Sequence, residues 1–423
     1  MSRDVFLGSI ADFKTGPFGT QLHADEYVSD GIPIINVKNI GNGSIIGDDI
    51  DYVSPETLAR LSEHTLREND IVFARKGSID RHAIINKKYD GCMQGSDCIR
   101  ARVYNPNINP KFLSHYLKLN SVKKQLVNSA VGSTMPSMNT DILKSIEIHL
   151  PEIEVQNRIE YLLSTIEGKN SNNNAICADL ERMTKLLYDY WFVQFDFPDE
   201  NGKPYKSSGG KMVWNEELKR EIPDGWEVNS LSEICDLSNG INYDKNEPGN
   251  KEYKIVNVRN ITASSLLLNE EDFDRITLKS SLGDKYLIHD NDILIARSGT
   301  PGAIRLLEKV NDNTIYCGFI IRCSLYDKAL RNYICYYLKM FEGTNATKTG
   351  GSILQNVSQE TLNMIKIPMP KSDLIASFNK STAPIIKNMQ NSINENQELA
   401  SLRDFLLPLL MNGQVKVKEG EKQ

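Results

Sequence analysis

The residues of this sequence that could perform chemistry are polar side chains that occur twice, in the same order, about 220 residues apart. In each copy an apolar run ends in Ala-Arg, at Arg75 and Arg297, and continues into a Gly-Ser or Gly-Thr turn. Such a turn offers backbone N–H groups, a hydroxyl and a guanidinium to a phosphate, and arginine can also contact guanine in the major groove. Each copy therefore carries the residue types of a nucleic-acid contact.

These repeated polar residues also have a structural interpretation. Asparagine and aspartate beside turns commonly bond to the backbone, and arginine commonly pairs with a neighbouring carboxylate. We favour the structural role for Asn36 and Asp70, and we leave both roles open for Arg75 and Arg297. The other repeated positions are Lys38 and Arg259, Asn39 and Asn260, and Ser78 and Thr300, while Asn257 and Asp292 repeat the first two.

Motifs of common catalytic centres do not occur in the sequence. It has no phosphate-binding loop of the form G-x-x-x-x-G-K-[ST] and no Asn/Asp-Pro-Pro-aromatic motif of the amino-methyltransferases. The six histidines are scattered, and a duplicated catalytic domain should keep a duplicated acid, base or nucleophile. We therefore predict a chain without catalytic activity, cofactor or metal.

Two segments have features of metal sites, and in both we favour another explanation. Cys92 and Cys98 share a C-x5-C spacing with Cys317 and Cys323, but no histidine pair lies nearby at a zinc-site spacing. Segment 198–203 contains the carboxylates and lysine of a metal-dependent nuclease, but in a Gly/Pro-rich loop rather than on strands. We predict buried thiols and a loop, respectively.

The elements that must position the repeated residues form two copies of a β-rich domain. Segments 34–40, 69–78 and 146–151 recur in order as 255–261, 291–300 and 365–370. Short apolar or β-branched runs between turn residues, such as 70–74 and 83–86, predict strands. One helix is expected at 110–126, with a counterpart at 329–341.

The loop tips differ between the copies. Gly16–Gln21 corresponds to Gly240–Asp244, and Val131–Ser137 corresponds to Thr349–Gln355. Because binding specificity commonly resides in loops, divergent loops on a repeated frame predict two related modules with different targets.

Each copy is followed by apolar residues at spacings of three and four, which predict a long helix. Two such stripes favour an antiparallel, coiled-coil-like pair with pseudo-two-fold symmetry. The Gly/Asn-rich stretch 168–174 is a poor helix former, so we expect a bend there. The predicted class is α+β, with a mainly-β domain at 1–151, a helix at 152–200, a linker at 201–227, a second mainly-β domain at 228–370, a helix at 371–412 and a tail at 413–423.

Composition and charge bound the function class. Hydrophobic residues make up 40% and charged residues 25% of the chain, which excludes collagen-like and wholly disordered proteins. No apolar run approaches the ~18 residues of a membrane span, and the acidic N-terminus does not suit a signal peptide, so we expect a cytoplasmic protein. The net charge of −6 resides in residues 152–200, with 4 basic and 10 acidic side chains. Near-neutral β domains can still bind DNA if their basic residues gather on one face.

The order β domain, helix, β domain, helix resembles the specificity subunits of Type I restriction-modification systems over nearly the whole chain. The motifs that carry the resemblance are Asn69–Gly77 with its copy Asn291–Gly299, Tyr190–Phe197, Ile222–Trp226 and Leu402–Leu410. Each motif is weak alone, and together in this order they are specific. The first copy lacks the Gly-Trp lead-in of the second, which leaves the start of the first domain open.

The resemblance implies a non-catalytic DNA reader. Each β domain would recognise one half of a split, asymmetric site, and the helices would set the gap between the half-sites. The helices would also dock two methyltransferase subunits, which bind S-adenosylmethionine, and through them motor-nuclease subunits. The candidate DNA-contacting residues are Phe18, Gln21, Lys38, Asn39, Arg75, Lys76, Ser78, Thr134 and Ser137 in the first copy, and Asn242, Tyr243, Arg259, Asn260, Arg297, Ser298, Thr300, Lys348 and Gln355 in the second. A self-sufficient DNA-modifying or DNA-cleaving enzyme and an adaptor without a nucleic-acid role remain as alternatives.

Overall fold

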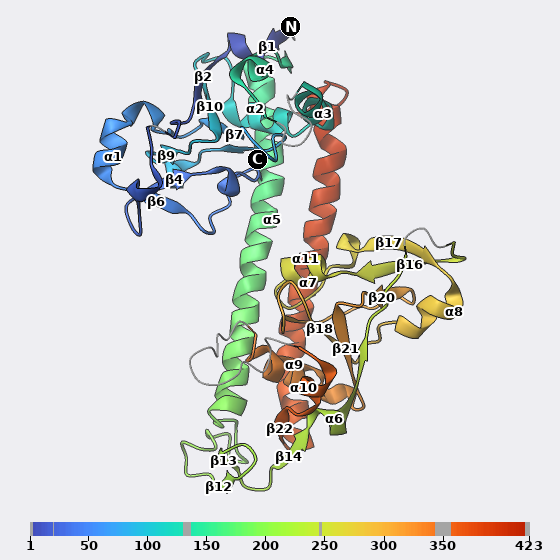
Figure 1. Ribbon diagram of the computed structural model, residues 1–423. Coiled ribbons are helices and arrows are strands. Elements are labelled where there is room, and N and C mark those ends of the chain that lie inside the picture. Colours follow the sequence, from blue (N-terminus) through green and yellow to red (C-terminus); the bar gives the residue numbers. More distant parts are fainter. Residues whose placement is uncertain (1–2, 20, 130–136, 245–247, 343–356, 419–423) are drawn as a thin grey trace. The chain divides into compact units, whose positions relative to one another are not determined.

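The computed structural model describes residues 3–19, 21–129, 137–244, 248–342 and 357–418, which form two compact units (Figure 1). Unit 1 comprises residues 1–169 and 398–423, and unit 2 comprises residues 170–397. Both long helices therefore contribute residues to both units. None of the helices in the described ranges combines the length and the apolar character that crossing a bilayer requires.

Unit 1 is built on a five-stranded sheet with the order β2-β10-β7-β8-β5 and a four-stranded sheet with the order β3-β6-β4-β9. The first strand, β1, pairs antiparallel with β11, and Asp4 lies opposite His149. The strands are β1 Arg3–Phe6, β2 Ala11–Thr15, β3 Tyr27–Val28, β4 Ile32–Ile35, β5 Asn42–Gly43, β6 Asp51–Val53, β7 Ile71–Ala74, β8 His82–Ile84, β9 Met93–Gln94, β10 Cys98–Val103 and β11 Glu147–Leu150. The helices outside the long pair are α1 Pro55–Arg60, α2 Pro110–Leu117, α3 Asn120–Ser129 and α4 Thr140–Lys144.

Unit 2 repeats this plan with a sheet of order β15-β21-β18-β19 and a second sheet of order β17-β16-β20. Its first strand after the hairpin, β14, pairs antiparallel with β22, and Val228 lies opposite Pro368. The strands are β12 Met212–Asn215, β13 Arg220–Pro223, β14 Glu227–Ser230, β15 Cys235–Asn239, β16 Lys251–Val256, β17 Asp274–Leu278, β18 Asp292–Ala296, β19 Ile304–Arg305, β20 Thr314–Tyr316, β21 Ile320–Leu325 and β22 Lys366–Met369. Its short helices are α6 Leu231–Ile234, α7 Val258–Ala263, α8 Ser280–Gly283, α9 Arg331–Lys339 and α10 Gln359–Asn363.

The repeated apolar runs become central strands that are buried on both faces. In β7, Ile71 and Phe73 pack into one hydrophobic core, and Val72 and Ala74 pack into another. In β18, Ile293 and Ile295 alternate with Leu294 and Ala296 in the same way. Because successive strand residues point to opposite faces, an uninterrupted apolar run is what a strand between two cores requires. The loops that follow β7 and β18 therefore start from a rigid base.

The two long helices are α5, Ile153–Tyr188, extended by a π-helical turn at Asp189–Val193, and α11, Ser372–Met411. In unit 1, Leu163 of α5 shares a core with Leu407 and Leu410 of α11. In unit 2, the ring of Tyr188 meets the ring of Phe378 edge-on at 6.1 Å. Since the N-terminal part of α5 meets the C-terminal part of α11, and the reverse, the pair is antiparallel, as the apolar spacing predicted.

Three expectations about elements need correction. The single helix expected at 110–126 is two helices, α2 and α3, because the chain turns at Lys118 and Leu119 so that Val122 and Leu126 return to the same core. The stretch 168–174 does not interrupt α5. The segment 201–227 is more ordered than a linker, because it contains the β12–β13 hairpin and buries Ile222 and Trp226.

Candidate nucleic-acid interface

The repeated Asn-Val-Lys/Arg-Asn segment is a structural turn in both units. In unit 1 the backbone N–H of Asn36 donates to Oδ1 of Asn39 (3.1 Å), and Nδ2 of Asn36 donates to Asp51 (2.8 Å). In unit 2 the backbone N–H of Asn257 donates to Oδ1 of Asn260 (2.8 Å). Asn39 is fully buried and Asn260 is 5% exposed. Because Asn39 and Asn260 are buried and hydrogen-bonded within the turn, we remove them from the candidate DNA contacts.

The basic residue inside this turn is ion-paired in both units. Nζ of Lys38 lies 2.8 Å from Asp49 and 3.1 Å from Asp51, and these hydrogen bonds raise the pKa of Lys38. Arg259 pairs with Asp274 in the same place. Their charges are therefore balanced within each unit, although both side chains remain exposed.

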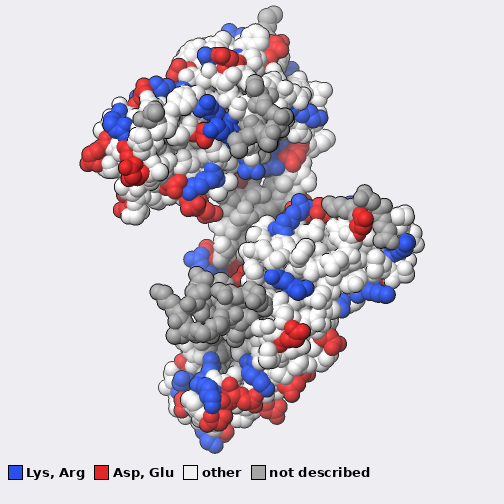
Figure 2. Space-filling model, in the orientation of Figure 1, with Lys and Arg blue, Asp and Glu red and all other residues white. Residues whose placement is uncertain are grey.

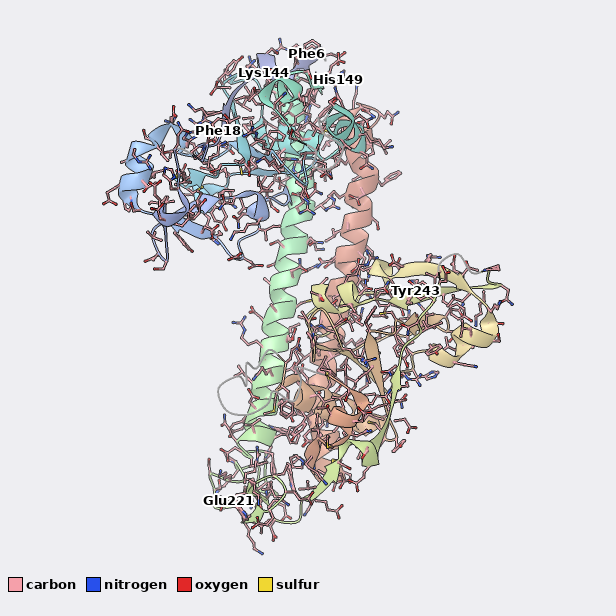
Figure 3. The ribbon with its side chains drawn as sticks, in the orientation of Figure 1. Phe6, Phe18, Lys144, His149, Glu221 and Tyr243 are labelled. Atoms are coloured by element: carbon pink, nitrogen blue, oxygen red, sulfur yellow. The ribbon has the colours of Figure 1, made fainter. Side chains whose placement is uncertain are left out.

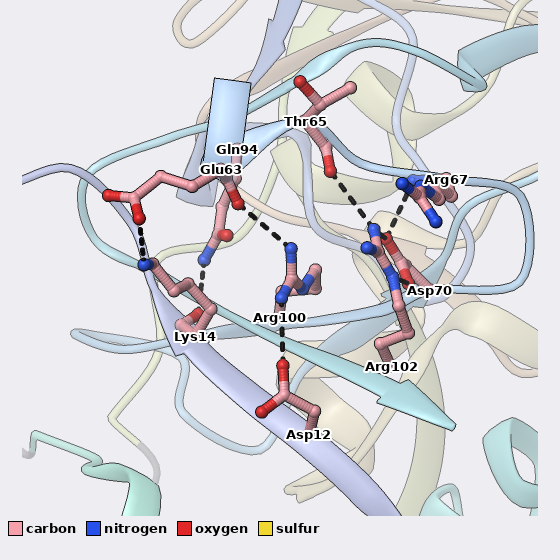
Figure 4. A network of polar contacts seen from close by, with 9 residues as sticks. All are labelled: Asp12, Lys14, Glu63, Thr65, Arg67, Asp70, Gln94, Arg100 and Arg102. Atoms are coloured by element: carbon pink, nitrogen blue, oxygen red, sulfur yellow. Dashed lines mark hydrogen bonds and ion pairs between the residues drawn. The ribbon is translucent and has the colours of Figure 1, made fainter. Parts of the chain in front are cut away.

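The repeated aspartate of unit 1 is hydrogen-bonded within the fold, and Figure 4 shows it with Arg67 and Arg102. Asp70 is 1% exposed, accepts hydrogen bonds from Nε and Nη2 of Arg102 (2.7 and 2.6 Å), and also accepts the backbone N–H of Arg67 (2.7 Å). The hydrogen bond to Asp70 raises the pKa of Arg102. In unit 2, Asp292 accepts the backbone N–H of His289 (2.7 Å), and Nε of Arg322 lies 3.8 Å away. The structural role that we favoured for Asn36 and Asp70 agrees with these bonds.

The repeated arginines differ from all of these residues. Within the described part of the chain, neither Arg75 nor Arg297 has a carboxylate partner. The guanidinium of Arg75 lies 5.1 Å from the ring centre of Phe18, which is half exposed. The side chain of Arg297 is exposed to solvent. Each unit thus has one copy of the repeated arginine, and its guanidinium is available to bind an external anion.

Four segments converge around each arginine. The backbone N–H of Arg75 donates to the carbonyl of Asp97 (2.8 Å), and the backbone N–H of Met138 donates to the carbonyl of Arg75 (2.8 Å). The backbone N–H of Arg297 donates to the carbonyl of Phe319 (2.9 Å) in the same way. The loop after β2 joins this group through Phe18, and the loop after β15 joins it through Asn242, which lines a cleft with Arg297, Val357 and Ser358. Figure 3 labels Phe18 and Tyr243 on these loops.

Glycines make this convergence possible. Gly77 and Gly299 have φ values of +75° and +76°, a conformation that other residues rarely adopt. A Cβ on Gly16 would lie 1.9 Å from the carbonyl oxygen of Gly95, and a Cβ on Gly240 would lie 2.2 Å from that of Cys317. We call this arrangement of turns the arginine frame: residues 16–19, 21, 75–78, 95–97 and 137–138 in unit 1, and 240–244, 297–300, 317–319 and 357–358 in unit 2.

The tips of the arginine frame differ between the units. In unit 2 a cleft of about 430 Å³ opens between the tips; it is lined by Asn242, Arg297, Ser298, Gly318, Phe319, Val357 and Ser358. Phe319 is 60% exposed and lines this cleft. In unit 1, Lys76 and Asp97 form an ion pair of 3.0 Å at the same place.

The other candidates are distributed as follows. Oε1 of Gln21 accepts the backbone N–H of Phe18 (3.2 Å), the carbonyl of Ser78 accepts the backbone N–H of Arg81 (3.1 Å), and Thr300 bonds Thr262 through their hydroxyls (3.2 Å). Tyr243 is partly buried, and this burial raises its pKa. Ser137 bridges to the backbone of Lys76. Thr134, Lys348 and Gln355 lie outside the described residues.

Sequence comparison between the copies missed Asp97 and Phe319. Both lie 22 positions after the repeated arginine, but they share no chemistry, so a search for identical residues passes over them. Charge does not reveal the site either. Among the described residues of the face shown in Figure 2, basic and acidic side chains are mixed.

The two segments with features of metal sites have other structural uses. Oδ1 of Asp199 accepts the backbone N–H groups of Asn201 and Lys203 (both 2.8 Å), as in an ordinary turn. Cys92 and Cys98 are buried free thiols, and burial raises the pKa of Cys92 to about 12. Across the described ranges, no group of three or more His, Cys, Asp or Glu side chains is placed to hold a metal ion.

Comparison with known proteins agrees with the duplicated architecture. A family model for the Type I restriction modification DNA specificity domain matches residues 2–182 and again residues 223–403. The specificity subunit of the type I restriction enzyme MjaIX of Methanocaldococcus jannaschii is 24% identical over 407 residues, which cover 88% of each chain. That of the enzyme HindI of Haemophilus influenzae is 22% identical over 451 residues, covering 91% of this chain and 94% of the relative.

A solved structure shares the fold. The S subunit of a type I restriction-modification system from M. genitalium superposes with a TM-score of 0.55 at 17% identity, covering 97% of this chain and 96% of the other. The family match spans both β domains and the helical segments that follow them. The chain therefore belongs to the family of Type I restriction-modification DNA specificity subunits.

Proposed function

We propose that each unit reads one half of a split, asymmetric DNA site through its arginine frame, and that the chain itself is non-catalytic. The observation that carries this proposal is the contrast among the repeated polar residues. The polar side chains of the repeated Asn-Val-Lys/Arg-Asn turn are bonded within the fold, and so are the repeated aspartates Asp70 and Asp292. In contrast, Arg75 and Arg297 have no carboxylate partner in the described part of the chain. An arginine held at the mouth of a rigid turn can bind two acceptors of guanine or a phosphate at fixed geometry.

Replacement of either arginine tests this role. We expect Arg75→Ala and Arg297→Ala each to weaken the complex with cognate DNA by ~1–3 kcal/mol, because each removes a charged contact. Titration of the chain, assembled with its methyltransferase, against labelled DNA measures the change. Arg275→Ala is the matched control, since Arg275 is an exposed arginine of unit 2 that pairs with Glu252. Equal affinities for all four proteins would rule out the arginine frame as the DNA site.

A map of methylated adenines tests whether each unit reads one half of the site. Plasmid DNA from cells that express the chain with its methyltransferase should carry methylated adenines at one split motif, and none when the chain is omitted. Exchange of residues 1–151 for those of a relative should change one half of the motif only. Methylation without the chain would contradict the proposal, and metal-dependent cleavage by the chain alone that is lost in Asp199→Asn would favour a self-sufficient enzyme.

The long helices are the proposed docking surface for the methyltransferase subunits and, through them, for the motor-nuclease subunits. Several large apolar side chains of α5 and α11 are exposed; they are Tyr161, Ile176, Met183, Leu186, Leu402 and Phe405. Tyr161 and Phe405 are 74% and 66% exposed, which is typical of residues that a partner covers.

The double variant Tyr161→Asp, Phe405→Asp tests the docking surface. We expect it to lose most of its co-purification with the methyltransferase, because two buried charges in an apolar interface are strongly unfavourable. Ser171→Asp, at an exposed polar position of the same helix, should co-purify normally. Normal recovery of the double variant would contradict the docking model. Equal loss of co-purification in Ser171→Asp would also contradict it, because the loss would then not depend on the exposed apolar side chains.

A further inference from the structure

At two neighbouring positions of the arginine frame, unit 1 has a pair of oppositely charged side chains and unit 2 has two uncharged side chains. In unit 1, Lys76 follows the repeated arginine and pairs with Asp97, and both side chains are about half exposed. In unit 2, Ser298 follows the arginine and Phe319 stands where Asp97 does. An ion pair in one unit is thus replaced by an uncharged hydroxyl and an aromatic ring in the other.

The backbone shows that these positions are equivalent. Asp97 and Phe319 each accept the backbone N–H of the repeated arginine through their carbonyl (2.8 and 2.9 Å). Each immediately precedes a strand, β10 or β21, and that strand pairs with β7 or β18, which ends one residue before the arginine. Two residues earlier, Gly95 donates its backbone N–H to Ile35 (2.9 Å), and Cys317 donates to Val256 (3.0 Å). The side chains at 97 and 319 therefore leave equivalent backbone positions, each hydrogen-bonded to the backbone of the repeated arginine.

The two side chains differ in chemistry, so they would favour different bases in the major groove. A carboxylate accepts a hydrogen bond from the exocyclic amino group of cytosine, while an apolar side chain packs against the methyl group of thymine. A carboxylate close to DNA is repelled by the phosphates unless a cation accompanies it, and Lys76 is that cation. Phe319 needs no counter-ion, and Ser298 supplies none.

We propose that Asp97 and Phe319 are specificity-determining residues that make the two half-sites different at one equivalent base pair. Asp97 selects a base with an exocyclic amino group, cytosine before adenine, and Phe319 selects thymine. The repeated arginine beside them supplies the same anchoring contact in both units. This inference rests on the proposed function, and it adds the residues that separate the two targets.

The test uses the complex of the full chain with its methyltransferase and a DNA library in which the half-site read by unit 2 is randomised. Wild-type complex should select thymine at one position, and Phe319→Ala should reduce that preference at least about fivefold, the lower end of ~1–3 kcal/mol for a base contact. The double variant Ser298→Lys, Phe319→Asp should shift the preference to cytosine or adenine at that position and leave the half-site of unit 1 unchanged. The reciprocal Lys76→Ser, Asp97→Phe exchange should introduce thymine in the other half-site.

The outcomes separate this inference from the proposed function. Failure of the wild-type complex to select any sequence would overturn the proposed function. Normal selection by the wild type together with identical selection by Phe319→Ala would overturn the inference alone. An equal loss of affinity for all sequences would also overturn it, because it would show that the ring stacks without reading a base. Phe319 is exposed, so Phe319→Ala decides the matter even if the double variants do not assemble.

Discussion

Asp70 and Arg75 lie five residues apart in the same repeated motif, and the structure gives them opposite uses. Asp70 is buried, and both of its carboxylate oxygens accept hydrogen bonds from Arg102. Arg75 has an aromatic neighbour and, among the described residues, no carboxylate partner. Repetition therefore marks residues that the fold needs as well as residues that a ligand needs, and the two kinds separate by whether their polar atoms are already bonded inside the unit.

Asparagine in place of the repeated aspartate should affect the two units unequally. Asp70→Asn removes a bidentate partner of Arg102, whose side chain is 27% exposed, so we expect a loss of about 2–3 kcal/mol in the free energy of unfolding of unit 1. In unit 2, Arg322 is 3.8 Å from Asp292, so Asp292→Asn should cost about 1 kcal/mol. Urea unfolding followed by hydrogen exchange in each unit measures both. A larger loss for Asp292→Asn would show that the ion-pair geometry does not control stability here.

The repeat identified the candidate polar residues from the sequence, but it could not separate those that stabilise the fold from those that are available to a ligand. The amide nitrogen of Asn39 donates to the backbone carbonyls of Ile46, Asp48 and Asp49, and nothing in the sequence indicates that the chain folds back to place them there. The sequence also passed over Asp97 and Phe319, because repeat detection depends on similarity. The residues that make two related modules different are those that such a comparison removes.

At the scale of elements, the continuity of α5 shows tertiary contacts overriding local propensity. Glycine and asparagine are poor helix formers, and the sequence from 168 to 174 accordingly predicts a weak point. Asn173, however, is 5% exposed, and its amide donates to Oε2 of Glu395 (2.8 Å) and Oδ1 of Asn396 (3.0 Å) on α11. A buried asparagine between paired helices commonly fixes their register at some cost in stability. We therefore expect the polar stretch to help set which residues of α5 and α11 face each other.

The hydrogen bonds of Asn173 to α11 can be tested by substitution, with the neighbouring Asn172 as the control. Asn173→Ala should destabilise the helix pair of unit 2 by about 1–3 kcal/mol, because it leaves Glu395 and Asn396 without this donor. Asn172→Ala should be neutral or slightly stabilising, since Asn172 is exposed and alanine is the better helix former. Thermal unfolding of the three proteins compares them. Equal destabilisation by both substitutions would assign the role to helix propensity rather than to the buried contacts.

The whole molecule is organised differently from the order of its sequence. Read along the chain, the motifs predict a β domain followed by its own helix, twice. The compact units instead combine residues 1–169 with 398–423, and residues 170–397 with one another. Periodicity correctly predicted the existence and the antiparallel pairing of the long helices. Antiparallel pairing places the end of the second helix beside the start of the first. Apolar spacing did not show that this end is buried in the core of the first unit, because spacing identifies a buried face but not the core that buries it.

Alanine substitutions in the last helix test this division of the molecule. Leu410 is 2% exposed in the core of unit 1, so we expect Leu410→Ala to destabilise that unit by about 2–5 kcal/mol, the usual cost of a cavity. Leu402 lies on the same helix at 46% exposure, and Leu402→Ala should have a small effect. Hydrogen exchange read separately on residues 3–150 and 228–370 distinguishes the units. Faster exchange confined to residues 3–150 in Leu410→Ala is expected, even though that sequence ends some 260 residues before the substitution. Faster exchange in 228–370 instead would mean that the second helix stabilises the β domain that precedes it in the chain.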